Sequence, residues 1–198
     1  MALIEKSFGY KSMWFAMKNT DIDEILLSCP NLANAKMTTW ENGLQAASKS
    51  SDKAFLSGVY DGWSFLTGTG ICEPTHVEDF MKLMSELGKC SNEICFFATH
   101  RVVELHCFAQ AVQGKIVRYY CYSGESGHIY VNMGERTEAE KRLSLNFPAD
   151  DEAFFGGDLD PIDETDILAL AEQMSIDPDM LIGMEEGKCI IADISGGM

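Results

Sequence analysis

Hydrophobic residues recur with the spacing typical of β-strands through most of the middle of the chain and near both of its ends. Residues 10–18 mix alternation with a continuous apolar centre, and residues 94–99 form one apolar run, so each predicts a strand. β-branched and aromatic residues then dominate three stretches near 102–111, 116–123 and 128–133, which glycine-containing turns separate. The pattern predicts a three-stranded antiparallel meander there.

Two further strand predictions depend on turn chemistry and on the apolar end of the chain. In residues 54–66, Asp61-Gly62 is typical of a two-residue hairpin turn, although a bulged hairpin fits the flanking residues as well. Cys189 to Ile194 forms a last apolar run and predicts a final strand.

Helices are predicted where a capping residue precedes apolar residues spaced three and four apart. Thr20 and Asp21 offer caps for a short helix that Pro30 ends, while Thr38 with Glu41 has capping-box spacing before a second helix. The best-supported helix has Thr75 and Glu78 as its capping box, Gly88 as its C′ residue and a stripe formed by Val77, Phe80, Met81, Met84 and Leu87.

The last third of the chain predicts three shorter helical segments. Thr137 and Glu140 cap a short helix, and Asp160-Pro161 begins a helix that runs to about Met174. Residues 175–181 add one more turn, and the buried stripe of the preceding helix consists of Ile167, Leu168, Leu170, Ala171 and Met174. The expected fold is therefore α+β: a mainly antiparallel sheet (a meander) with helices packed against it, in a single domain over 1–198.

Charge sets one part of this chain apart. The 198 residues hold 31 acids and 15 bases, for a formal net charge of −16. Residues 135–186 carry 16 of those acids and 3 of the bases, a net charge of −13, and we call them the acid-rich segment. Such a field repels nucleic acid and anionic membranes and favours a basic partner, although solubility alone would also explain it.

The densest acidic stretch is ADDEAFFGGDLDPIDETD, residues 149–166. It fails the calcium-loop pattern, because a loop begun at Asp158 puts Asp163 where glycine is needed. Eight carboxylates also show none of the selection that a glycosidase pair requires. We therefore predict a partner-binding surface rather than a metal or catalytic site, formed by Asp150, Asp151, Glu152, Phe154, Phe155, Asp158 and Asp160.

The seven cysteines include no CxxC pair and lie mostly in apolar surroundings. They predict buried free thiols in a reducing compartment. The amino-terminal residues do not resemble a secretory signal, and no apolar run is long enough to span a membrane. We expect a cytoplasmic protein.

Catalytic signatures are missing from the sequence, so neither a catalytic residue nor a cofactor is predicted. The four histidines have no zinc-binding spacing, and His106 and Cys107 should face opposite sides of a strand. The competing hypothesis is a hydrolase-like enzyme whose site combines His100, Arg101 and Glu104 with a cysteine of the sheet. A non-catalytic regulatory subunit is a third interpretation.

Several stretches resemble a known group of proteins: FGYKSMWFAMK, TTWENGLQAA, DGWSFLTG, FFATHRVVELHCFAQAVQGKIVRYYCYSGE and LALAEQMSIDPDML. They resemble small, mostly uncharacterised bacterial proteins, many of which look like immunity proteins of polymorphic or contact-delivered (type VI secretion) toxins. The resemblance implies an immunity protein that neutralises a cognate toxin or effector by binding it, without catalysis, and an acidic surface suits a basic toxin. Neither nucleic acid nor a membrane is an expected partner.

Overall fold

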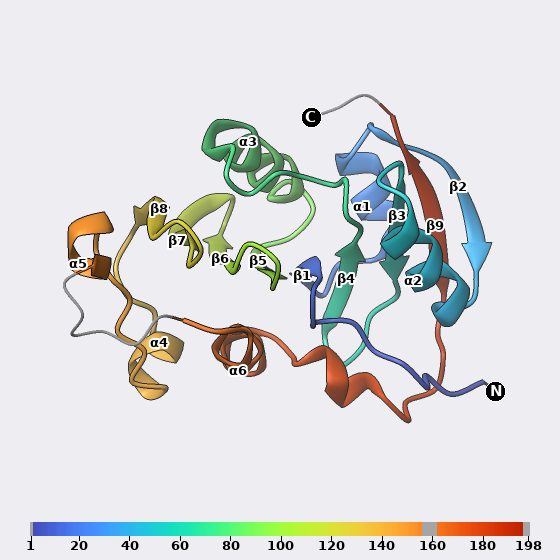
Figure 1. Cartoon of the computed structure of the whole chain (residues 1–198). Coiled ribbons are helices and arrows are strands. Elements are labelled where there is room, and N and C mark those ends of the chain that lie inside the picture. The colour runs from blue at the N-terminus through green and yellow to red at the C-terminus, as the bar shows by residue number, and fades with distance from the viewer. Residues whose placement is uncertain (1, 156–161, 196–198) are drawn as a thin grey trace.

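In the computed structural model, residues 2–155 and 162–195 are described, and they build a nine-stranded antiparallel sheet (Figure 1). The strand order is β2-β9-β3-β4-β1-β5-β6-β7-β8, so β2 and β8 are the two edge strands. The strands are β1 (Met13–Lys18), β2 (Leu32–Thr38), β3 (Lys53–Ser57), β4 (Trp63–Thr67), β5 (Glu93–His100), β6 (Leu105–Val112), β7 (Lys115–Ser123), β8 (His128–Met133) and β9 (Cys189–Ile194).

Alternating side chains give the sheet an apolar core on each face. In β1, Trp14 and Ala16 belong to one core, whereas Phe15 and Met17 belong to the other. This follows from the strand period of two, which sends successive side chains to opposite faces. Because both faces are buried, the central strands are apolar runs, as the sequence pattern of 94–99 predicted.

Helices cover both faces of the sheet. The helical elements are α1 (Ile22–Ser28), α2 (Trp40–Lys49), α3 (Val77–Leu87), α4 (Glu138–Arg142), α5 (Asp151–Phe155), α6 (Glu164–Met174) and the 3₁₀ turn η1 (Pro178–Leu181). Buried residues of α1 and α3 join the core that contains Phe15, while those of α2, α4 and α6 join the core that contains Trp14. Figure 1 shows α3 on one side of β5–β8 and α4 and α6 on the other. The α+β prediction is confirmed.

The predicted meander is confirmed in its pairing, but its first strand begins at Leu105 and not near 102, because residues 101–104 form the turn from β5. β5, β6, β7 and β8 follow one another as antiparallel neighbours, with Phe97 opposite Phe108 and Phe108 opposite Tyr120. The Asp61-Gly62 hairpin is also present, since Tyr60 and Trp63 pair on either side of those two residues. Only Phe55 and Leu56 of β3 pair with β4, so the ladder is interrupted near the turn.

Several predicted helix starts are wrong, although the helices themselves exist. Thr39, not Thr38, caps α2, and α3 begins after His76 without a side-chain cap because the Thr75 hydroxyl bonds Glu73 instead. Gly88 follows α3 with a right-handed backbone rather than as a left-handed C′ residue. The helix predicted from Asp160-Pro161 begins at Glu164, because the Asp163 carboxylate accepts from the Thr165 and Asp166 amides.

Candidate functional site

The first part of the predicted partner-binding surface lies at an edge of the sheet, where it forms a short helix. Residues 151–155 form α5, and the Asp150 carboxylate accepts a hydrogen bond from the Ala153 amide at 2.8 Å. Asp150 and Glu152 are exposed. Of the remaining predicted residues, Asp158 and Asp160 lie outside the described residues, as do the side chains of Phe154 and Phe155.

Asp151 attaches this helix to the edge strand β8. One carboxylate oxygen accepts from the Ile129 amide at 2.7 Å, and the other lies 2.9 Å from Nδ1 of His128. The amide hydrogen bond and the His128 contact together lower the pKa of Asp151. The Asn132 side chain also donates to the Ala149 carbonyl. An otherwise unpaired strand edge is therefore partly covered, which protects it from pairing with other chains.

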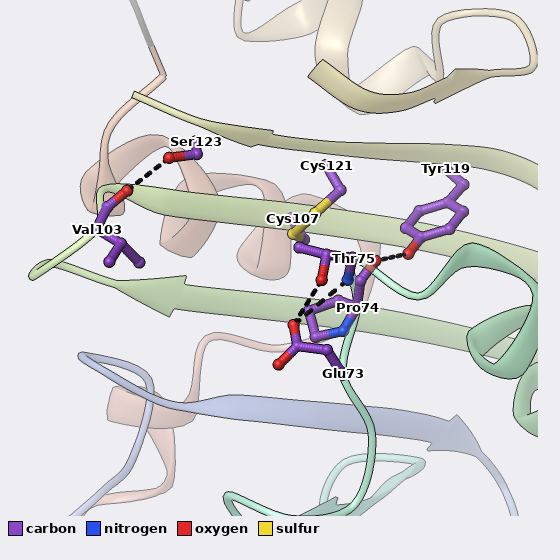
Figure 2. The surroundings of a disulfide bond; sticks show 8 residues. All are labelled: Glu73, Pro74, Thr75, Val103, Cys107, Tyr119, Cys121 and Ser123. Carbon is purple, nitrogen blue, oxygen red and sulfur yellow. Dashed lines mark hydrogen bonds between the residues drawn. A yellow bond between two sulfur atoms is a disulfide. The ribbon is translucent and has the colours of Figure 1, made fainter. Parts of the chain in front are cut away.

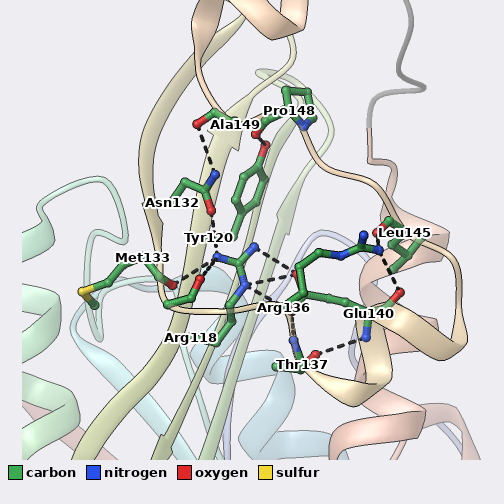
Figure 3. A network of polar contacts seen from close by, with 11 residues as sticks. Arg118, Tyr120, Asn132, Met133, Arg136, Thr137, Glu140, Leu145, Pro148 and Ala149 are labelled. Atoms are coloured by element: carbon green, nitrogen blue, oxygen red, sulfur yellow. Dashed lines mark hydrogen bonds and ion pairs between the residues drawn. The ribbon is translucent and has the colours of Figure 1, made fainter.

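A buried ion pair holds α4, the first helix of the acid-rich segment, to strand β7 (Figure 3). Arg118 of β7 and Glu140 of α4 are 3.0–3.1 Å apart through three nitrogen–oxygen contacts, and both side chains are at most 3% exposed. The guanidinium also donates to Asn132 and to the carbonyl of Met133. Each of the three guanidinium nitrogens of Arg118 thus has at least one acceptor, which a buried charge requires.

A third carboxylate, Glu164, anchors the start of α6. It accepts from the Thr99 hydroxyl at 2.8 Å and the Lys11 amide at 2.7 Å, and it pairs with Arg101. Burial acts to raise the pKa of Glu164, but these three donors outweigh burial and lower it. Glu140 and Glu164 therefore support the fold. Composition alone does not distinguish them from the exposed acids of the same segment.

The residues of the enzyme hypothesis lie in two separate cavities. His100 lines a cavity of about 700 Å³ that Thr75 and His76 also border. Arg101 and Glu104 line another, of about 430 Å³, whose wall includes His106. The structure therefore does not bring His100 together with Arg101 and Glu104 around a single cavity. His106 and Cys107 belong to opposite faces of β6, as predicted, with His106 stacked on Tyr122.

Cysteine chemistry differs from the sequence prediction at two positions. Cys107 and Cys121 form a disulfide (Figure 2), so the prediction of seven free thiols is wrong for this pair. The reason is the register: the two residues lie directly opposite each other in β6 and β7, 4.1 Å apart at Cα. The spacing of the cysteines along the sequence does not indicate which of them lie opposite each other on neighbouring strands.

The other five cysteines are free, and none is activated as a nucleophile. Burial raises the pKa of Cys29 and of Cys189 to about 12, and it also raises the pKa of Cys72, Cys90 and Cys95. A thiol is reactive as its thiolate, so at neutral pH these groups are poor attacking groups.

Within residues 2–155 and 162–195, no group of three or more His, Cys, Asp or Glu side chains is placed to hold a metal ion. None of the helices described there has the length and apolar character to cross a bilayer.

Comparisons with protein-family models, curated proteins and solved structures find no match for this chain. Within the acid-rich segment, Glu140, Asp151 and Glu164 connect helices to the sheet, and Asp150 and Asp163 cap helices. Other acids of the segment, such as Glu135, Glu152 and Glu172, are exposed.

Proposed function

We propose that this protein is an immunity-type inhibitor that binds and neutralises a basic toxin or effector domain without catalysis, in the cytoplasm of the cell that makes it. The observation that carries the proposal is the position of the acid-rich segment. Its helices α4 and α6 lie over strands β5–β8, α5 lies beside the edge strand β8, and most of its described carboxylates are exposed. Five of the seven cysteines are free, which fits a reducing compartment, whereas the Cys107–Cys121 disulfide is more typical of an oxidising one.

Charge at this density favours capture of a basic protein. A surface of one sign accelerates encounter with a partner of the opposite sign and disfavours anionic competitors. Such steering weakens as salt screens the charges, over a distance of about 8 Å at physiological ionic strength. A binder that works this way needs exposed carboxylates on a rigid support, and α5 is held to β8 by Asp151.

The first experiment captures partners of the tagged protein from its native cells at low and at high salt, with identification by mass spectrometry. A stoichiometric basic partner should remain. Expressing that partner alone in a heterologous host should arrest growth, and co-expression of this protein should restore it. The proposal fails if the captured partner is harmless, or if growth stays arrested when the two proteins are co-expressed.

A pair of charge-matched variants then tests the surface. One replaces Asp150, Glu152, Asp158 and Asp160 with their amides and retains Asp151, which holds α5 in place. The control neutralises four exposed acids elsewhere: Glu5, Asp61, Glu78 and Asp79. Both variants lose the same net charge.

In the first variant, both the affinity for the captured partner and the salt dependence of that affinity should fall much more than in the control. Equal losses in both would show that only net charge matters. Unchanged affinity in the first variant would place the binding surface elsewhere on the molecule.

A further inference from the structure

The His106 cavity lies where the acid-rich segment meets β6 and β7. It is about 430 Å³ in volume, and its lining includes Arg101, Glu104, His106, Tyr122, Asp163 and Glu164. Two elements fix its geometry: the β6–β7 pair, in which His106 lies opposite Tyr122, and the first turn of α6, which Asp163 caps. The Tyr122 hydroxyl donates to the Ile162 carbonyl and ties these elements together.

One wall of the cavity contains a buried polar group that the fold does not satisfy. His106 is 5% exposed, and among the described residues nothing hydrogen-bonds to its Nδ1. Buried polar atoms nearly always have a partner, and leaving one without a partner costs roughly 1–3 kcal/mol. Burial lowers the pKa of His106. This effect is larger than the opposite effect of the nearby carboxylates of Glu164, Asp163, Glu104 and Asp166, which raise the pKa. The ring is therefore neutral near pH 7 and able to accept a hydrogen bond.

The carboxylates around this ring are not all used by the fold. Glu164 is engaged by Arg101, Thr99 and Lys11. Asp163 uses only Oδ1 for the cap of α6, and within the described chain neither its Oδ2 nor the Glu104 carboxylate has a protein donor; both residues are exposed, so a partner can reach them. Among the described residues, four carboxylates thus act on His106, and Arg101 is the only guanidinium that lines the cavity.

We infer that the His106 cavity binds a guanidinium or primary ammonium group, supplied by an arginine or lysine side chain of the basic partner. The cation would donate to Glu104 and Asp163, with the Tyr122 and His106 rings beside it. The identity of the partner rests on the proposed function, whereas the chemistry of the site rests on the cavity alone.

Other occupants fit this cavity less well. An anion would meet the excess of carboxylates, and a metal ion would need three suitable ligands, which the described residues do not bring together. An apolar side chain would leave the buried imidazole without a partner and would gain nothing from the charges of Glu104 and Asp163. A planar guanidinium matches paired carboxylate oxygens and can stack on an aromatic ring.

The first test uses a small probe and the isolated protein. L-argininamide is titrated while the ring signals of His106 are followed by NMR, and L-citrullinamide serves as the control because it replaces the guanidinium with a neutral urea. We expect saturable shifts of the His106 signals with argininamide and much weaker ones with citrullinamide.

Two variants with matched roles show whether the effect is local. Asp163→Asn and Asp21→Asn each remove one exposed charge from a helix N-cap that is part of a capping box, and asparagine preserves the cap. Asp163→Asn should weaken argininamide binding by about tenfold, the usual size for a lost hydrogen bond to a charged group, while Asp21→Asn leaves it unchanged. Equal effects of the two variants, or His106 signals that do not move, would overturn the site.

The second test addresses the source of the cation. Affinity for the captured partner is compared between the Glu104→Gln, Asp163→Asn double variant and Asp21→Asn. Loss in the double variant alone supports a partner side chain. If argininamide binds but the double variant has the same affinity for the partner as Asp21→Asn, the cation comes from another source and that part of the inference is overturned. If argininamide fails while the partner still binds, the cavity proposal falls and the proposed inhibitor function stands.

Discussion

Glu140 and Asp151 both hold the acid-rich segment to the β7–β8 strands, but they do so in opposite environments. Glu140 pairs with Arg118 where both side chains are almost wholly buried, whereas Asp151 pairs with His128 where both are about half exposed. Breaking a buried pair leaves an uncompensated charge in a poor solvent, whereas water replaces a lost partner at the surface. Similar carboxylates in one segment therefore make different contributions: the buried one supports the whole fold, whereas the exposed one holds α5 locally.

The largest effect should come from breaking the buried pair. Glu140→Ala should reduce the free energy of unfolding by about 3–5 kcal/mol, because the Arg118 guanidinium loses its counter-charge while buried. Denaturant unfolding measures this. Glu138→Ala is the control, since that acid lies on the same helix but is exposed and should leave the unfolding midpoint in place. A midpoint that both variants leave unchanged would refute the contrast between buried and exposed carboxylates.

A smaller loss is expected at the start of α6. Glu164→Ala removes the acceptor for the Thr99 hydroxyl and the Lys11 amide and should cost roughly 2 kcal/mol. Glu172→Ala, on the exposed face of the same helix, should cost nothing measurable. Equal unfolding midpoints for the two variants would show that Glu164 contributes no more than a surface acid.

His106 should contribute a pH dependence of intermediate size. Its folded-state pKa lies below the ordinary value of 6.5, so the unfolded chain binds a proton first as the pH falls. This contribution to stability is complete above pH 6.5 and declines below it, by at most about 1.4 kcal/mol per pH unit. Unfolding of wild type and His106→Gln between pH 7.5 and 5.5 should show the steeper decline in wild type. Parallel curves would contradict a neutral buried imidazole.

The smallest global effect should come from the exposed pair. Asp151→Asn should leave the unfolding midpoint unchanged but accelerate hydrogen exchange at the Ile129 amide, whose acceptor is weakened. Because the pKa of Asp151 is lowered, the contact is complete above the ordinary value of 3.8 and is lost as the pH falls through the lowered value. Glu152→Gln is the control. An unchanged exchange rate in Asp151→Asn would mean that α5 is held by other contacts.

Local signals predicted much of this architecture. The meander strands, the Asp61-Gly62 turn, the Asp21 and Thr137 caps and the buried stripe of α6 depend on neighbours within a few residues, so the sequence displays them directly. β2 was not predicted, because four of its seven residues are exposed and its pattern does not alternate. Its strand structure comes from pairing with β9, more than 150 residues away.

By itself, the sequence determined the α+β class, the positions of the central strands, the acidity of residues 135–186 and the weakness of any catalytic signature. Periodicity, turn residues and composition are local properties, and they persist whatever the chain contacts. Only the tertiary structure decided that Glu140 and Glu164 are structural, that Cys107 meets Cys121, and that His106 lies unsatisfied beside free carboxylates. Strand register and burial assign these roles, and both arise from contacts between residues far apart in the chain.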